Sequence, residues 1–389
     1  MYFVGIDISK YKHDCCIINE MQDIIASFMF TNDRQGFSEL EVYLNSVPDP
    51  DDEMRIGFEA TSHYALNLKL FLEESHHSFM EFNPILLSKF KSANTLRRTK
   101  TDSVDCLEIA RFMMTVDFKP HPEKFYHMYS LKSLVRCRYK LLKTRAKYSV
   151  AITNTLDAVF PEYKPFFKES LSTTALYIIE NYPSAEKISR LTTASYSKIN
   201  AAVHGHFSAD KFAKLKQLAK DSVGQSNEFL ETELLLNIRI FKTIDMEISK
   251  LEEQITEIVH QVNPHFLTIR GMGVFTAATI LAECGDIHNF ANADKLLAFA
   301  GLEPGIYQSG TSEKNAKMVK HGSAYLRYAL LNCVIPLIKC NVTFASYYNK
   351  KITEGKPYRV AATHVAKKLI RVIYTLETKG IDYNENLLR

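Results

Sequence analysis

The stretch YFVGIDIS, residues 2–9, decides the fold of the first part of the chain. It is short and rich in residues that favour β-structure. Two similar runs follow it after polar turns, HDCCIINE at 13–20 and IIASFMFT at 24–31. Three such runs in succession predict a meander of adjacent strands. A helical pattern comes next at 36–46, where Phe37, Leu40 and Leu44 share one face with Tyr43 beside them.

Beyond this meander, MRIGFEAT at 54–61 predicts a strand, residues 63–75 a helix, and residues 77–84 another strand. Three strands followed by strand–helix–strand units are typical of an RNase H-like domain, an α/β fold in which helices flank a mixed sheet. We therefore expect a first domain over residues 1–125.

The composition is that of an ordinary globular protein, with 389 residues of which 46 % are hydrophobic and 24 % charged. No apolar run reaches the ~18 residues of a membrane span, and the first residues lack the layout of a secretory signal. Seven cysteines without a CxxC pair predict reduced thiols and not a disulfide frame or a zinc cage. We expect a cytoplasmic protein without a membrane partner, located with the nucleoid if it is bacterial.

The net charge is only +4, so the distribution of charge matters more than its sum. Residues 132–147, KSLVRCRYKLLKTRAK, carry seven basic residues and no acidic one, and their apolar residues recur at helical spacing. A solvated helix face is one interpretation. A face of one sign without counter-charge is more typical of nucleic-acid contact, and the candidate residues are Lys132, Arg136, Arg138, Lys140, Lys143, Arg145 and Lys147.

The middle of the chain, residues 126–264, is predicted to be helical. An a/d heptad pattern runs for about three heptads near its end, with Phe241, Ile248, Ile255 and Val262 at one seam position and Ile244, Leu251 and Ile258 at the other. This pattern predicts a coiled coil, either folded back as a hairpin or pairing two subunits.

Residues 265–389 are predicted to form a third, mostly α domain. It opens with a Gly-x-Gly, residues 271–273, between two apolar runs, as in a helix-hairpin-helix. Backbone N–H groups at such a helix start can hold a phosphate. A tight turn between two helices explains the same pattern equally well.

Four acidic residues fall where an unpaired carboxylate would be costly or would need a partner. Asp7 lies inside one apolar strand and Glu59 ends another, while Asp102 and Asp105 are three residues apart behind the basic run RRTK at 97–100. The last two could simply cap a helix and favour its dipole, but that would leave the first two without a role.

Together these four residues supply hard oxygen donors from converging elements, which suit Mg²⁺. Two such ions can clamp the attacking and leaving oxygens of a phosphoryl transfer. Arg97, Arg98 and Lys100 would then guide phosphate. The acids therefore predict a site that binds magnesium, with two ions expected.

The segments GIDISK, FEATSHY, KTDSVD and LLAFAGLEPGIYQSGTS…KHGSAYLRYAL, taken in this order, resemble the DEDD transposases of bacterial insertion sequences. These are bridge-RNA-guided serine recombinases with a RuvC-like N-terminal domain and a C-terminal transposase domain. The resemblance covers both ends of the chain, while the middle matches only in being helical. Ser62 and Cys106 depart from the Gly and Ala that the family often has there, and both are small residues.

The resemblance implies that Asp7, Glu59, Asp102 and Asp105 form the catalytic, metal-binding tetrad and that Ser309 in YQSGTS is the nucleophile. Ser312 and Ser323 are competitors for that role. It implies attack of Ser309 on DNA to give a 5′-phosphoserine link and a free 3′-hydroxyl. The distant parts of the chain that carry these residues, from one subunit or two, must therefore meet.

The resemblance also implies the partners. They are target and donor DNA, a structured noncoding guide RNA that selects both by base pairing, and further copies of the chain in a dimer or tetramer. The basic helix would hold the RNA, and Arg327 is a weaker candidate for binding phosphate.

Three other functions fit part of the sequence. A metal-dependent nuclease or Holliday-junction resolvase of RuvC or RNase H type would use the same acids with water as nucleophile. A sugar-kinase-like ATPase shares the opening GIDIS, but the Gly-rich phosphate loops that it needs are not evident in the first domain. A non-catalytic nucleic-acid-binding scaffold would leave the four acids unexplained.

Overall fold

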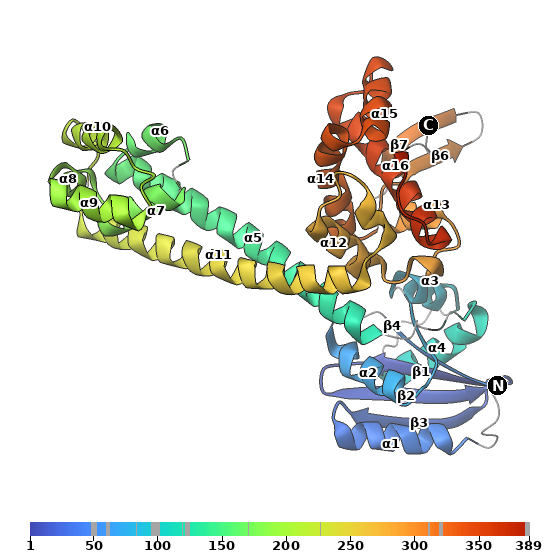
Figure 1. Ribbon diagram of the computed structural model, residues 1–389. Helices are drawn as coiled ribbons and strands as arrows, with labels where there is room; N and C mark the ends of the chain where they lie inside the picture. Colours follow the sequence, from blue (N-terminus) through green and yellow to red (C-terminus); the bar gives the residue numbers. More distant parts are fainter. Residues whose placement is uncertain are drawn as a thin grey trace. The chain divides into compact units, whose positions relative to one another are not determined.

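The computed structural model describes residues 1–47, 53–59, 63–82, 84–94, 102–118, 120, 125–169, 171–225, 227–309, 312–318 and 322–385. The chain divides into two compact units, Met1–Tyr129 (unit 1) and Ser130–Arg389 (unit 2), and each is described by itself (Figure 1). The boundaries expected at residues 125 and 264 stay predictions.

Unit 1 is built on a five-stranded sheet with the strand order β3-β2-β1-β4-β5. The first three strands form an antiparallel meander: β1 (Tyr2–Ile8), β2 (Lys12–Asn19) and β3 (Ile24–Thr31). On the other side of β1, β4 (Met54–Glu59) and β5 (Phe79–Phe82) run parallel to it. The predicted mixed sheet is confirmed: the central strands β1 and β4 are largely buried, whereas the edge strand β3 is largely exposed.

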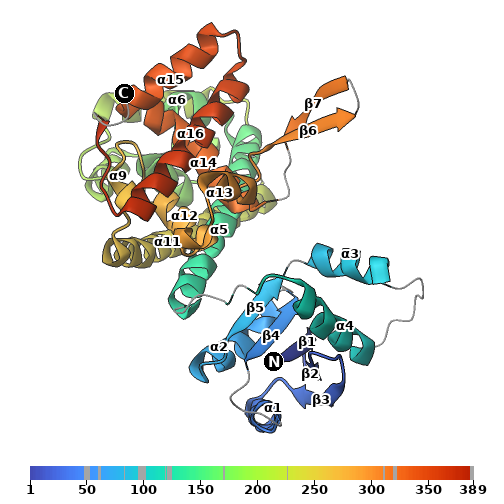
Figure 2. The ribbon, with the colours of Figure 1, turned by 90° about the vertical axis from the view of Figure 1, so that its right-hand side faces the viewer.

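Helices cover both faces of this sheet (Figure 2). One face packs against α1 (Arg34–Asn45) and α2 (Leu66–Glu74), which follows a 3₁₀ turn, His63–Ala65. The other face packs against α3 (Pro84–Asn94) and α4 (Asp102–Thr115). In α1, Leu40 and Leu44 are buried as predicted, while Tyr43 is 40 % exposed and stacks on Phe28 of β3.

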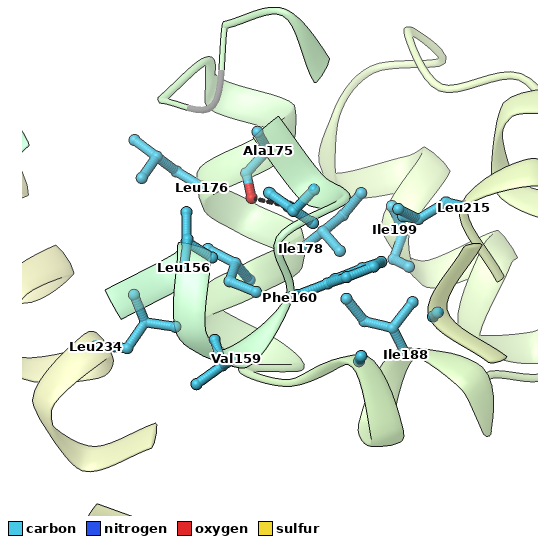
Figure 3. Close-up of a cluster of buried hydrophobic side chains, with 14 of the residues drawn as sticks. Leu156, Val159, Phe160, Ala175, Leu176, Ile178, Ile188, Ile199, Leu215 and Leu234 are labelled. Carbon is cyan, nitrogen blue, oxygen red and sulfur yellow. Dashed lines mark hydrogen bonds between the residues drawn. The ribbon is translucent and has the colours of Figure 1, made fainter. Parts of the chain in front are cut away.

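In unit 2, two helices of 35 residues each, α5 (Phe125–Val159) and α11 (Glu228–Val262), lie side by side and antiparallel as a long arm (Figure 1). Five short helices join their far ends: α6 (Tyr163–Phe167), α7 (Thr173–Asn181), α8 (Ala185–Ser189), α9 (Thr193–Ala202) and α10 (Ala209–Lys220). They enclose an apolar core around Phe160 (Figure 3). The Tyr163 hydroxyl, buried in this core, donates to the Ala175 carbonyl at 2.6 Å.

The arm is therefore a coiled-coil hairpin within one chain, and its seam differs in part from the predicted one. Ile248 and Ile255 are buried as expected, but Val262 is 48 % exposed and Val259 is buried in its place. At the second predicted seam position Ile244, Leu251 and Ile258 are half-buried, and so are their neighbours Asp245 and Glu252. These two acids pair with arginines of α5.

The rest of unit 2 is mostly α-helical, as predicted, with one two-stranded hairpin. It contains a 3₁₀ turn (His265–Thr268), α12 (Val274–Cys284), a 3₁₀ turn (Ile287–Asn289), α13 (Ala293–Phe299), β6 (Pro304–Ser309), β7 (Ser312–Met318), α14 (Ala324–Cys340), α15 (Val342–Thr353) and α16 (Tyr358–Lys379). Among the helices described, none alone has the length and hydropathy of a membrane span, although the bent pair α14 and α15 passes that test when taken together.

The Gly-x-Gly of residues 271–273 follows a single 3₁₀ turn and not a full α-helix, so the helix-hairpin-helix expectation is not met in its usual form. Gly271 has a φ of +96°, and a Cβ there would lie 2.9 Å from the Pro336 carbonyl oxygen of α14. The glycine is required for a tight turn and a close backbone approach. This supports the structural interpretation of the motif.

Candidate active site

Two glycines let α4 lie directly on the sheet. Gly5 of β1 and Gly57 of β4 are partners in the parallel register. A Cβ on Gly5 would lie 2.2 Å from the Cys106 carbonyl oxygen, and one on Gly57 would lie 2.1 Å from the Met113 sulfur. Because side chains larger than hydrogen cannot fit there, the two glycines set the distance between α4 and the two central strands.

The same glycines show which way the predicted carboxylates point. Successive side chains of a strand alternate between faces, and Ile6 and Phe58 belong to the core on the α1–α2 face. Asp7 and Glu59, each two residues beyond a glycine that meets α4, therefore project from the α4 face. They are half-buried and lie one step past the last register pair of the two neighbouring parallel strands.

Helix α4 crosses the strands above these positions. The Cys106 thiol hydrogen-bonds the Cys16 thiol of β2, the Cys106 carbonyl lies over Gly5 of β1, and Met113 lies over Gly57 of β4. The helix starts at Asp102, one turn before Cys106, and Asp105 is half-buried in its first turn. Position 102 shares the sheet-facing row of the helix with position 106, although the side chain of Asp102 lies outside the described set.

A fifth acid, Asp14, belongs to the same face and was not singled out from the sequence. It is the register partner of Asp7 across the β1–β2 ladder, two residues before Cys16, whose side chain packs against α4. The hairpin register, read from the short turn between the two strands, was the signal that could have found it. Among the described side chains, no three from His, Cys, Asp and Glu converge closely enough to hold one metal ion.

Ser309 is the last residue of β6 and pairs with Ser312, the first residue of β7. Gly310 and Thr311, which separate them, lie outside the described residues, as do the side chains of both serines. The β6–β7 hairpin projects from the helices of unit 2 (Figure 2), so Ser309 lies at its outer end. The four acids of the predicted tetrad belong to unit 1 and Ser309 to unit 2.

Two glycines close the base of this hairpin. Gly301 has a φ of +65°, and a Cβ on Gly322 would lie 1.9 Å from the Phe299 carbonyl oxygen. That carbonyl accepts a hydrogen bond from the Ser323 N–H at 2.9 Å. The Arg327 guanidinium donates to the Ala300 carbonyl at 3.3 Å, so this predicted phosphate ligand instead supports the base of the hairpin.

A buried ion pair ties this base to the long helix α5. Arg136 donates to both carboxylate oxygens of Glu283 in α12, at 2.8 and 2.9 Å, and the Ser323 hydroxyl donates to the same carboxylate at 2.8 Å. Burial alone would raise the pKa of Glu283. The hydrogen bond from Arg136, the charge of Lys132 and the hydrogen bond from Ser323 outweigh burial, so its pKa is lowered.

The structure corrects part of the expected basic face on α5. Arg136 pairs with Glu283, Arg138 with Glu252 at 2.6 Å, and Arg145 with Asp245. The supposed absence of counter-charge was wrong for these three arginines, because the acids come from 100 to 147 residues further along the chain. Lys132 is half-buried near Glu283, whereas Lys140, Lys143 and Lys147 are exposed. Arg97, Arg98 and Lys100 lie outside the described residues.

Two family models match the chain. A DEDD transposase model of IS110 type matches residues 4–161, which include all four acids, and a model described as "Transposase IS116/IS110/IS902 family" matches residues 263–349, which include Ser309. Together the matches cover more than half of the chain; they include α5 and leave out α11 and the short helices between the two.

Relatives match over nearly the full length. A pilin gene-inverting protein of Moraxella bovis is 24% identical over 389 residues, which is 99% of this chain and 98% of that protein. An uncharacterized 42 kDa protein of insertion element IS900 from Mycobacterium paratuberculosis is 23% identical over 96% of this chain and 95% of its own length. The transposase of insertion sequence IS1111A from Coxiella burnetii is 30% identical over 30% of this chain and 33% of its own length. The chain belongs to the IS116/IS110/IS902 family of transposases.

Proposed function

We propose that this transposase cleaves and rejoins DNA through a covalent phosphoserine link, using a divalent metal held by a RuvC-like domain. DEDD transposases are generally metal-dependent. We propose further that the metal is Mg²⁺, that two ions bind, and that Ser309 is the nucleophile.

One observation carries the proposal. Asp7 and Glu59 project from the same face of two neighbouring parallel strands, the face against which α4 packs, and the first turn of α4 contains Asp102 and Asp105. Hard carboxylate oxygens are the donors that Mg²⁺ prefers. Carboxylates gathered on one face also repel each other, and a divalent cation removes that repulsion. The donor set therefore fits the metal, with Asp14 as a further neighbour of Asp7.

The chain's own groups account for the atoms of the transfer. The Ser309 oxygen forms a bond to the scissile phosphorus, the bond from phosphorus to the 3′ oxygen breaks, and the serine proton ends on that 3′ oxygen. Reversal of this step on the partner strand rejoins the DNA without an external energy source. A bound divalent ion would supply charge that neutralises the phosphate and favours ionisation of the hydroxyl.

The outer end of a hairpin suits this role because it can reach a phosphate that the helices of unit 2 could not approach. The nucleophile and the carboxylates must act on one phosphate, from one subunit or from two. Mixing Ser309→Ala protein with Glu59→Ala protein tests this point. Recovery of recombination in the mixture indicates that different subunits supply the two groups.

Trapping the covalent adduct tests the chemistry. Purified protein, cognate DNA and the noncoding RNA of the element are incubated with Mg²⁺, and the protein–DNA adduct is resolved on a denaturing gel. Ser309→Ala should abolish the adduct and Ser312→Ala, the matched control at the register partner, should retain it. Asp102→Ala should lose both adduct and recombination. An adduct of normal yield from Ser309→Ala would exclude that serine.

Guidance by RNA is tested in the same reaction. Omitting the RNA should abolish recombination. Changing its target-pairing loop should redirect recombination to a DNA that matches the new loop. The exposed lysines of α5, Lys140, Lys143 and Lys147, are proposed contacts to a nucleic-acid backbone.

A metal-dependent nuclease or junction resolvase is the second candidate, because the same acids on the sheet could hold a metal that activates water, and not a serine, as the nucleophile. It predicts cut DNA with no covalent adduct under any condition, and equal activity of the Ser309→Ala variant.

A further inference from the structure

A hollow of about 250 Å³ lies in unit 2 between α5, α11, α12 and α14. Aromatic rings line much of it. The ring of Tyr139 meets Tyr325 and Tyr328 edge-on, with centroids 5.0 and 5.1 Å apart, and Phe275 lies on the α12 side. Tyr328 is 53 % exposed, so the aromatic lining reaches the surface.

Polar groups are placed around these rings. The Arg138 guanidinium lies 4.1 Å from the centroid of the Phe275 ring, where its ion pair with Glu252 holds it. Asn332 also lines the hollow and is exposed, one turn beyond Tyr328 on α14. An apolar slot with a few fixed donors and acceptors is typical of a site for a small planar group.

Positive charge borders the hollow on one side. The Lys143 ammonium lies 4.5 Å from the centroid of the Tyr139 ring. Lys140, Lys143 and Lys147 are spaced three and four residues apart, so they form one exposed row along α5. Within the described part of the chain no ion pair occupies any of the three.

We infer that this tyrosine-lined hollow binds one unpaired base of the DNA substrate, while the row of lysines holds the phosphates of the same strand. The hollow has room for one ring system and not for a base pair, and aromatic rings beside a cationic row are what single strands bind. The inference rests on the proposed function for the identity of the ligand as DNA. It adds a site, separate from the serine and the acids, that selects a distorted strand.

A fluorescence titration tests the inference with the full-length protein. The probes are a DNA duplex with one bulged 2-aminopurine, the same duplex with that base paired, and an RNA duplex with the same bulge. The Ser309→Ala protein is titrated in parallel. If the Ser309→Ala protein binds the bulged DNA but forms no adduct, base binding by the hollow does not depend on the serine chemistry. The two proposals can then fail independently.

Binding of each duplex is followed by the anisotropy of an end label, and the expected result is a change in 2-aminopurine emission on the bulged DNA only. Tyr328→Ala should weaken binding of the bulged DNA by about 5- to 150-fold, the range for loss of one base–aromatic stack, and leave paired DNA unaffected. Tyr328→Phe keeps the ring and should bind normally. Lys143→Gln should weaken both DNAs and reduce the salt slope by about 0.7 to 0.9.

Four results would overturn the inference. Tyr328→Ala could bind bulged DNA as tightly as the wild type, or lose both DNAs equally. The RNA bulge could bind more tightly than the DNA bulge. The Tyr328→Ala variant could change the oligomeric state in light scattering, which would assign the hollow to an interface between copies of the chain.

Discussion

Replacing Arg136 by alanine tests how the base of the hairpin is held. The variant leaves the Glu283 side chain, which is only 1% exposed, with the Ser323 hydroxyl and the nearby charge of Lys132. Breaking a buried pair in this way costs ~3–5 kcal/mol. Because two partners remain, we expect the lower end, a loss of about 3 kcal/mol in the free energy of unfolding of unit 2.

Replacing the other partner, Glu283, should lower the free energy of unfolding much less. Glu283→Gln leaves Arg136, whose side chain is 40% exposed and can be hydrated, and keeps an acceptor for its hydrogen bonds. We expect a loss of about 1 kcal/mol. The structure thus predicts an asymmetry between the two partners, and the double variant Arg136→Ala/Glu283→Gln should be more stable than Arg136→Ala alone because no uncompensated charge is buried.

Urea unfolding measures these differences. The chain has no tryptophan, so far-UV circular dichroism and tyrosine fluorescence are the signals, and Tyr325, whose ring lies 4.7 Å from the Arg136 guanidinium carbon, reports locally. The control is Arg190→Ala, which removes an exposed pair with Glu186 and should cost no more than ~0.5 kcal/mol. A loss below about 1 kcal/mol for Arg136→Ala, or equal losses for the two single variants, would refute the reasoning.

The same pair predicts a pH dependence. The native pKa of Glu283 is lowered below its usual 4.5, so the stabilisation is present above pH 4.5 and is lost as the pH falls through the native pKa. In Arg136→Ala the carboxylate can protonate when buried. The difference between wild type and variant should therefore shrink below pH 4.5, and a constant difference would contradict the assignment.

Three further predictions concern other contacts. Gly5→Ala should destabilise unit 1 by about 3 kcal/mol, the upper range for overpacking, whereas Gly273→Ala, whose Cβ meets nothing within 4 Å, should unfold at the wild-type urea concentration. Burial lowers the pKa of His13 to about 4, so stability should fall as the pH drops from 6.5 towards 4. His13→Phe should remove up to ~1.4 kcal/mol per pH unit of that slope. Arg138→Glu should lower the melting temperature of the arm, and Glu252→Arg in the same chain should restore it; no recovery would exclude the seam pairing.

The sequence predicted the fold of unit 1 well because its signals are local. Each strand of the meander is a short apolar run bounded by a polar turn. The spacing of Leu40 and Leu44 predicts the buried face of α1. The placement of α4 could not be predicted in this way. It depends on Gly5 and Gly57 becoming neighbours, which requires the parallel pairing of strands whose partner residues are 52 positions apart.

In the candidate site, too, local features could be predicted from the sequence and features that depend on distant segments could not. Asp7 and Glu59 stood out as acids in apolar strands, and the structure adds that both point to the α4 face. Asp14 was missed because its neighbours are less apolar and its importance lies only in its register with Asp7. The ion pairs of the arginines on α5 were missed, since no local pattern reveals partners that lie in α11 and α12.

Those arginines also explain why the arm has one register. Seven residues along α5, from Arg138 to Arg145, correspond to seven residues back along α11, from Glu252 to Asp245, as antiparallel pairing requires. A slip of one heptad would place Arg138 opposite Asp245, but Arg145 would then meet an apolar layer and Glu252 would meet Leu131. With an apolar seam alone, the two registers would have similar free energies. In the slipped register two partly buried charges lose their partners, which makes that register less stable. The arginines of α5 therefore fix the register of α5 against α11.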